Sequence, residues 1–344
     1  MRLIKPSTES IKLDLNSPNS ILKHIETVGR NCYKSEEKIT DDSYIAFVKM
    51  LIRKGHYAML EHNLIPIKIE GLWAQDCFYV LQKLNAQLDE ETLETYDTRF
   101  INFTDDKNGF IISANLRVYR DLLRFYNKDF FVESIIASLI NEGYGIMFED
   151  LNLDFLEEEK VNNIKLTIIK DTSNFSSIEK LYHEFRSVRF ICDRGVSHEI
   201  VRHRVAAFAQ ESTRYCNYGK DSHIVFIIPN WFKEENIISS LEGEYCTDPI
   251  CPCIAEEEVW FRSMCDAEAN YNKLVGTIED PIWIAGRARS VLPNSLKTDI
   301  IVTMNLRGWK HFFNMRLPVT AHEQMRELTI PLYEKEFKNL YESM

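Results

Sequence analysis

The sequence predicts an α+β fold in which a mixed sheet forms the core and helices flank it. Several stretches have apolar residues every three to four positions, as on one face of an amphipathic helix. Between them lie short runs rich in Val, Ile and Phe, as expected of buried strands. With 344 residues, of which 45% are apolar, the chain is long enough to bury a sizeable core.

The first part of the chain alternates between these two patterns. Residues 2–15 are typical of a strand, and Ile21, Ile25 and Val28 have the spacing of one helix face. A helix is expected over 42–54 and should end at Gly55, because glycine readily adopts the left-handed conformation at a helix end. Alternation over 64–69 then predicts a strand.

The pattern from about residue 70 to 180 is helical but uninformative, with polar stretches at 104–108 and 157–160. After it, strands are predicted over 188–192, 224–228 and 299–304, and helices over 197–202, 255–275, 306–315 and from 318 to the C-terminus. Residues 110–117 resemble residues 300–307, since each is a β-branched run followed by Asn-Leu-Arg and a predicted helix. We attribute this to asparagine's preference for helix N-caps, with a duplicated element as the alternative.

Composition narrows the class of protein. The net charge of −11 disfavours non-specific binding to nucleic acid or to an anionic membrane. An anionic substrate must therefore meet a local basic pocket. No apolar stretch of membrane-spanning length and no N-terminal apolar stretch is visible, so we expect a cytoplasmic protein.

Eight cysteines in a chain of this length do not indicate a disulfide scaffold. Cys246, Cys251, Cys253 and Cys265 lie close together in sequence, and we interpret them mainly as ordinary reduced thiols. A structural zinc site is the alternative, although Cys-Pro-Cys is not the usual spacing of two zinc ligands. We therefore predict no metal.

The chemically most specific segment runs from Arg202 to Tyr215 and contains three arginines and a histidine. Arginine makes forked contacts to phosphates and to planar ring edges, which predicts a site for a phosphorylated, ring-bearing ligand. The alternative is a solvated basic helix face, but consecutive residues 202–204 cannot share one face of a helix or strand.

Arg-His-Arg followed after seven residues by Ser-x-Arg-Tyr resembles the signature of the flavin-dependent thymidylate synthases. The resemblance extends over residues 1–66, 186–220 and 284–330, and includes Gly-His-Tyr-Ala-Met-Leu-Glu-His at 55–62 and Asn-Leu-Arg at 305–307. It implies one domain spanning 1–344, with a large, mostly helical insertion at about 70–185 that has no counterpart in the family pattern. It also implies a homotetramer with FAD held between subunits.

The family resemblance implies reductive methylation of dUMP to dTMP. Methylenetetrahydrofolate would donate the carbon, and FAD reduced by NADPH would supply the hydride. Arg316 would be the catalytic residue, stabilising negative charge at the pyrimidine edge, since a guanidinium stays charged and its fork matches a planar acceptor.

Other roles follow by matching motif positions. The residues expected at dUMP are Glu199, Ile200, Val201, Arg202, Gln210, Glu211, Ser212, Thr213, Arg214, Arg289 and Arg316. Those expected at FAD are His56, Ala58, Arg202, His203, Arg204, Gln210, Asn305, Leu306, Arg307 and His311. Ala58 and Ala207 stand where the family often has serine, so any flavin contact at Ala58 would use its backbone amide.

Three other classes of function stay open at this stage. A cysteine-dependent thymidylate synthase would need Cys253 for turnover. A nucleic-acid-binding module would use the arginine segment and show steep salt dependence, which the negative charge disfavours. A zinc-stabilised interaction protein would lose its fold on chelation.

Overall fold

The computed structural model describes most of the chain. The described residues are 1–11, 17–71, 101–106, 108–126, 128–154, 164–214, 216, 218, 224–232, 255–280 and 283–344. Among them, no helix combines the length and the apolar character needed to cross a membrane.

The first four-stranded sheet is antiparallel and has the order β2-β7-β10-β8. Its strands are β2 (Ser7–Ile11), β7 (Phe185–Asp193), β10 (Lys297–Asn305) and β8 (Ala207–Gln210). Alternate β10 residues face opposite sides, so that Val302 joins one apolar core and Ile301 another. The strand is buried on both faces because helices cover each side of the sheet.

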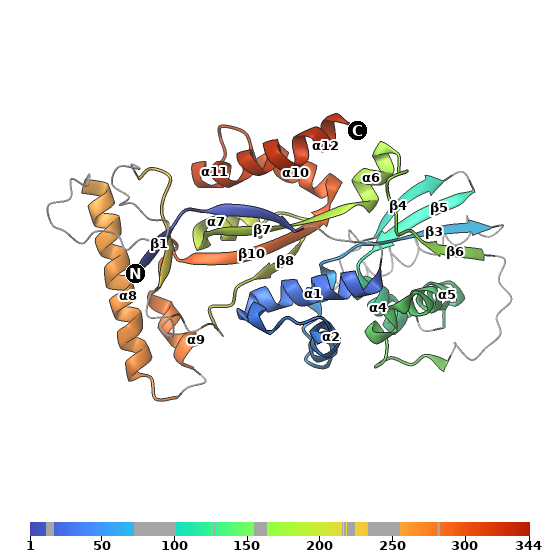
Figure 1. Ribbon diagram of the computed structural model, residues 1–344, viewed down its shortest axis with the longest axis horizontal. Coiled ribbons are helices and arrows are strands. Elements are labelled where there is room, and N and C mark those ends of the chain that lie inside the picture. The colour runs from blue at the N-terminus through green and yellow to red at the C-terminus, as the bar shows by residue number, and fades with distance from the viewer. Residues whose placement is uncertain are drawn as a thin grey trace.

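Helices α10 (Leu306–Arg316), α11 (Glu323–Leu332) and α12 (Lys338–Glu342) lie on one side of this sheet, and α1 (Pro18–Tyr33) lies on the other (Figure 1). The helix α7 (Arg194–Ile200) packs against β7 and β10. Trp309 of α10 stacks on Phe190 of β7 and Phe312 meets the same ring edge-on, which fixes α10 against the sheet.

The second four-stranded sheet is also antiparallel and has the order β4-β5-β3-β6. Its strands are β4 (Asn102–Asp106), β5 (Gly109–Ala114), β3 (Ile65–Gly71) and β6 (Ile164–Ile168). It shares a large apolar core with α1, α2 (Ser43–Arg53), α4 (Leu116–Phe125) and α5 (Phe130–Leu139). The short helix α6 (Ser177–His183) leads from this sheet into β7.

A third core lies at the other end of the molecule (Figure 1). It is built by the parallel pair β1 (Arg2–Ile4) and β9 (Val225–Ile227) with the helices α8 (Ala255–Thr277) and α9 (Ile284–Ala288). Tyr271 of α8 and Phe226 of β9 are fully buried in it.

The α+β class is confirmed, as are most predicted elements. Gly55, with φ of 67°, follows α2 as expected, and Asn115 and Asn305 both act as N-caps. Two details differ. The opening strand is two short strands rather than one, and the segment 318–322 precedes α11 instead of being helical.

The segment predicted to be an insertion, at about 70–185, contains strands that the helical pattern did not reveal. Three of the four strands in the second sheet, β4, β5 and β6, come from it, alongside α4, α5 and α6. Residues 104–106 of the polar stretch belong to β4 and pair with β5, where Asp106 lies opposite Gly109. Polar side chains are common on an edge strand such as β4. The alternation of apolar and polar residues that marks a strand was therefore not visible in its sequence.

Candidate functional site

A cavity of about 660 Å³ lies where the ends of the two four-stranded sheets meet. Four of the residues predicted to bind FAD line it together: Arg204, Asn305, Arg307 and His311. The other wall comes from the second sheet and its helices, namely Glu61, Asn63, Leu64, Ile101, Asn102, Phe103, Asn115 and Tyr182. The cavity thus joins residues predicted to bind FAD to residues for which no role was predicted.

The start of α10 forms one side of this cavity. The Asn305 side chain caps the helix, because its Oδ1 accepts the Gly308 N–H at 2.8 Å. Its Nδ2 donates to Asn102 Oδ1 at 3.1 Å and to the Tyr182 carbonyl at 3.4 Å. The Arg307 guanidinium lies 5.0 Å from the centroid of the Tyr182 ring. The polar atoms of Asn305 are thus engaged within the protein, whereas Arg307 is exposed at the cavity.

The Arg202–Arg204 segment forms a turn between α7 and β8, so it is not a solvated helix face. Arg204 lines the cavity and donates to the Val201 carbonyl at 3.1 Å. His203 is buried, and its ring centroid lies 5.2 Å from that of His311. Burial lowers the pKa of His203 to about 4, with the nearby His311 and Arg316 acting in the same direction. His203 is therefore a neutral imidazole at pH 7, and its buried Nε2 has no hydrogen-bond partner in the protein.

Arg316 lies at the opposite end of α10 from Arg307. Nine residues of helix separate the two arginines by about 13.5 Å, which supports different ligand contacts for each. Arg316 donates from one terminal nitrogen to the Glu199 carbonyl at 2.9 Å, while its other lies 3.9 Å from Glu199 Oε2. Its Nε is buried without a partner. His322 Nδ1 lies 3.0 Å from the other Glu199 carboxylate oxygen.

The Ser212–Arg214 turn follows β8 and forms a second group of predicted dUMP residues. The Ser212 amide donates to the Cys32 carbonyl of α1 at 3.1 Å. Arg289 donates to Thr213 Oγ1 at 3.1 Å, which brings two predicted dUMP residues together. The Arg214 amide donates to Ser212 Oγ at 3.3 Å. The Arg202 segment and this turn therefore lie before and after β8 respectively.

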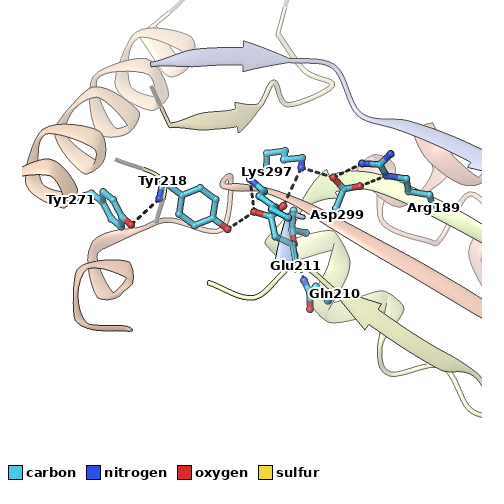
Figure 2. A network of polar contacts seen from close by, with 9 residues as sticks. Arg189, Gln210, Glu211, Tyr218, Tyr271, Lys297 and Asp299 are labelled. Carbon is cyan, nitrogen blue, oxygen red and sulfur yellow. Dashed lines mark hydrogen bonds and ion pairs between the residues drawn. The ribbon is translucent and has the colours of Figure 1, made fainter. Parts of the chain in front are cut away.

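Glu211 sits in a network of buried charges beside that turn (Figure 2). One carboxylate oxygen accepts from Tyr218 at 2.6 Å and lies 2.8 Å from Lys34 Nζ, and the other accepts from Lys297 at 3.1 Å. The side chain is completely buried. Glu211 was predicted to contact dUMP, but both oxygens of its carboxylate already have partners within the protein.

The network continues along the sheet (Figure 2). Lys297 also donates to Asp299 Oδ2 at 2.6 Å, and Arg189 forms a two-pronged pair with the same carboxylate at 2.6 and 2.9 Å. These partners hold the pKa of Asp299 below its ordinary value although burial acts to raise it. The two carboxylates thus bind β8, β10 and β7 to one another next to the Ser212 turn.

Several predicted residues have no free side chain at the cavity. Ile200 and Leu306 are fully buried in the apolar core, and Leu306 also uses its amide and carbonyl in contacts with Glu184 and Tyr341. Gln210 donates to Ser197 and Thr298 at 2.8 and 3.2 Å. Side-chain contact of Ile200 or Leu306 with a ligand is therefore excluded by their burial in this conformation.

His56 and Ala58 lie in the short helical segment η2 (Tyr57–Glu61) or just before it. His56 Nδ1 is 2.6 Å from the Tyr33 hydroxyl, and Ala58 is exposed. Neither lines the cavity, whereas Glu61 of the same segment does.

Sequence reasoning missed the second wall of the cavity, above all Asn102 and Tyr182. A signal was present in the Asn108-Gly109 dipeptide, which is typical of β-hairpins and would have indicated the β4–β5 pair. No comparable signal marks Tyr182.

A second cavity of about 490 Å³ lies beside Glu199, lined also by His198, Trp231, Trp260 and His322. Among the described residues, no group of histidine, cysteine and acidic side chains could hold a metal ion. Cys246, Cys251 and Cys253 lie outside the described part of the chain, so the cysteine cluster stays a prediction.

Comparison with known proteins gives a family match and several similar relatives. The profile of the family described as "Thymidylate synthase complementing protein" matches residues 133–340. A flavin-dependent thymidylate synthase of Pyrococcus furiosus is 31% identical over 147 residues, covering 42% of this chain and 50% of the relative. One of Clostridium tetani is 28% identical over 209 residues, covering 57% and 74%. The chain spans about half the length of the first curated relatives that it matches.

Two solved structures are also similar in part. Thymidylate Synthase X from Helicobacter pylori, solved with FAD and dUMP, has a TM-score of 0.34 and 22% identity over 47% of this chain and 72% of its own. A UMP/dUMP methylase from Streptomyces cacaoi has a TM-score of 0.37 and 13% identity over 99% and 93%. Both scores are too low to support an argument.

Proposed function

Because this chain belongs to the family of thymidylate synthase complementing proteins, we propose that it is a flavin-dependent thymidylate synthase. It would convert dUMP to dTMP with methylenetetrahydrofolate as carbon donor and NADPH as reductant of FAD. We infer one domain over 1–344, with an insertion at about 70–185. The observation that carries the proposal is the cavity lined by Arg204, Asn305, Arg307 and His311.

The cavity fits a flavin dinucleotide in size and chemistry. Its volume of about 660 Å³ is typical of a small-molecule site. Arg204 and Arg307 lie beside the N-terminal end of α10, and this combination suits a pyrophosphate. Phe103 and Phe185 give apolar surface for a ring. Bound there, FAD would supply the hydride that completes the methyl group.

The buried His203 imidazole would serve the same site. Because it is neutral at pH 7, it can donate or accept one hydrogen bond without adding charge. Buried polar atoms are normally hydrogen-bonded, but Nε2 of His203 has no partner in the protein. A bound ligand could provide the missing hydrogen-bond partner.

Arg316 would act on the pyrimidine. Its Nε has no partner and its ion pair to Glu199 is long, so the guanidinium can meet another acceptor while one terminal nitrogen keeps its hydrogen bond to the Glu199 carbonyl. Negative charge that develops at N3 and the flanking carbonyl oxygens of dUMP would be stabilised by a fixed, permanently charged fork. Arg289, Arg214 and the Ser212 hydroxyl would take the phosphate.

We propose a homotetramer in which active sites are shared between subunits. Arg202 precedes β8 and Ser212 follows it, and four extended residues span about 13 Å. In an assembly with active sites between subunits, a nucleotide held by the Ser212 turn of one copy could meet the Arg202 segment of another.

The cysteine-dependent alternative finds no support among the described thiols. Burial is the main cause that raises the pKa of Cys32 to about 12 and of Cys216 to about 11, and it raises that of Cys192 further. Such thiols are poor nucleophiles at pH 7 because the thiolate is the reactive form.

The first test is the absorption spectrum of the purified protein after incubation with excess FAD and desalting, followed by assay of dTMP. We expect a bound flavin spectrum, NADPH oxidation that is faster with dUMP, and dTMP that requires all three substrates. Cys253→Ser, which removes a cysteine of the alternative mechanism, should still form dTMP. Protein that retains no flavin, or that loses dTMP formation in Cys253→Ser with its flavin intact, would contradict the proposal.

A further inference from the structure

The insertion builds the second wall of the proposed flavin cavity, and two of its residues hold the α10 residues that face the cavity. Asn102 lies at the start of β4, and Tyr182 lies near the end of α6. Both line the cavity opposite Asn305 and Arg307. Residues about 200 and 120 positions away in sequence therefore meet the start of α10.

Tyr182 contacts Arg307 through its ring. The guanidinium carbon lies 5.0 Å from the ring centroid, within the range of a cation–π interaction. Arg307 is exposed, so without this surface its long side chain would sample many rotamers. The ring therefore restricts the guanidinium to the cavity edge.

Asn102 acts on the neighbouring residue. Its Oδ1 accepts from Asn305 Nδ2 at 3.1 Å, and the same Nδ2 reaches the Tyr182 carbonyl at 3.4 Å. These contacts leave Asn305 Oδ1 directed at the Gly308 amide, where it caps α10. The orientation of the helix start thus depends on both insertion residues.

The wall itself is held rigidly. His183, next to Tyr182, is fully buried and bonds to Thr104 of β4 and to Ser113 of β5, each at 2.7 Å. One imidazole therefore joins α6 to both strands, which keeps Tyr182 and Asn102 in a fixed relation to each other.

We propose that Tyr182 and Asn102 are positioning residues for cofactor binding. Tyr182 orients Arg307 toward the pyrophosphate of a dinucleotide, and Asn102 holds Asn305 as the N-cap that fixes the start of α10 beside it. The insertion would then be part of the cofactor site rather than a peripheral addition. This inference rests on the proposed function, because it takes FAD as the ligand of the cavity.

The test compares Tyr182→Leu with Tyr182→Phe, which keeps the ring face and serves as the matched control. FAD affinity is measured by titrating the apoprotein and following flavin fluorescence, and the thermal unfolding of each apoprotein checks folding. We expect FAD binding in Tyr182→Leu to be about 2- to 30-fold weaker, and Tyr182→Phe to remain close to the parent.

A double-mutant cycle separates positioning from general damage to the fold. In an Arg307→Ala background, Tyr182→Leu should weaken FAD binding little further, because the ring would have no guanidinium to orient. The affinity for dUMP, measured calorimetrically, should stay within about twofold of the parent in all of these variants. Equal FAD affinities of the parent and Tyr182→Leu, or additive effects in the cycle, would overturn the role of Tyr182.

Asn102 provides an independent test of the same wall. Asn102→Ala removes the acceptor for Asn305 and should weaken FAD binding, while Asn102→Gln keeps an amide acceptor without adding negative charge beside a pyrophosphate and should recover most of it. Unchanged affinity in Asn102→Ala would overturn its role while leaving the parent's flavin binding, and hence the proposed function, intact. A parent without FAD affinity would overturn both.

Discussion

At the scale of single residues, Arg316 differs from the other arginines of the site in having a buried nitrogen without a partner. Removing a charge-assisted donor from a developing anion typically costs about 3–4 kcal/mol, or roughly a hundred- to thousandfold in rate. We expect Arg316→Ala to reduce dTMP formation by this amount. Arg316→Lys should fail nearly as badly, because lysine keeps the charge but loses the planar fork.

The measurements are single-turnover dTMP formation and flavin content. Flavin content should stay near that of the parent, because Arg307 and Arg204, rather than Arg316, line the proposed flavin cavity. A rate close to the parent in Arg316→Ala would show that the role assigned to it is wrong.

Glu211 leads to a second prediction at this scale, about stability. Its carboxylate is completely buried and neutralises Lys34 and Lys297, and the Lys297 side chain is only 14% exposed. Without Glu211, Lys297 and Arg189 would share the single negative charge of Asp299. Removing one partner of a buried pair typically costs about 3–5 kcal/mol. We expect Glu211→Ala to lower the free energy of unfolding in urea by that order.

The matched control is Glu149→Ala. Glu149 also pairs with a lysine at 2.8 Å, but both side chains of that pair are about half exposed. Such a pair contributes about 0–1 kcal/mol. Equal losses in the two variants would show that the buried network has no special structural role.

At the scale of elements, two strand-to-helix connections have the same construction. The strand β5 leads through Asn115 into α4, and β10 ends at Asn305, which begins α10. In each case the asparagine side chain accepts an amide from the first helical turn. Asn115 and Asn305 both line the same cavity. The similarity of residues 110–117 to residues 300–307 therefore reflects two strand-to-helix connections of the same kind.

This construction can be tested at Asn115. Asn115→Ala should lower the free energy of unfolding by about 1 kcal/mol through loss of the cap, while Asn115→Asp should recover most of it. Urea unfolding of the two variants measures the difference. If alanine and aspartate behaved alike, the capping role of the side chain would be refuted.

The elements also show what the sequence could and could not predict. The strands and helices of the motif-bearing parts have clear periods, and β7, β10 and α10 were predicted within a few residues. The strand β4 was missed because its Thr104, Asp105 and Asp106 are polar on an edge strand. The local sequence pattern does not show which strand an edge strand of this kind pairs with.

The same limit applies to the site. Arg307 could be selected from its motif, but Tyr182 could not, since its contact depends on two segments more than 100 residues apart in sequence. Glu211 could be placed beside the nucleotide turn, but its two lysine partners, Lys34 and Lys297, come from the end of α1 and from β10. Long-range partners decide whether a charged residue binds a ligand or the protein itself.

At the scale of the whole molecule, buried histidines join the two four-stranded sheets. His24 Nε2 lies 3.0 Å from Ser187 Oγ, which lies 2.6 Å from Thr303 Oγ1, and His62 Nδ1 lies 2.7 Å from the same hydroxyl. This chain of contacts runs from α1 through β7 and β10 to the segment before β3. Burial lowers the pKa of His24 to about 4 and that of His62 to about 3.

These shifts predict acid sensitivity. Above about pH 6.5 both histidines are neutral in the folded and the unfolded chain, so they leave stability independent of pH. Between about pH 6.5 and 4 the unfolded chain binds protons that the folded chain does not. As the pH falls through this range, each histidine therefore lowers the free energy of unfolding by about 1.4 kcal/mol for every pH unit. The raised pKa values of Asp193 and Glu61 act in the opposite direction, so a comparison of slopes is needed.

The measurement is urea unfolding of the parent and of His24→Gln at several pH values between 7 and 5, since glutamine can still reach Ser187 but does not titrate. We expect a slope that is shallower by about 1.4 kcal/mol per pH unit in the variant below pH 6, whereas an unchanged slope would mean that His24 is protonated in the folded protein.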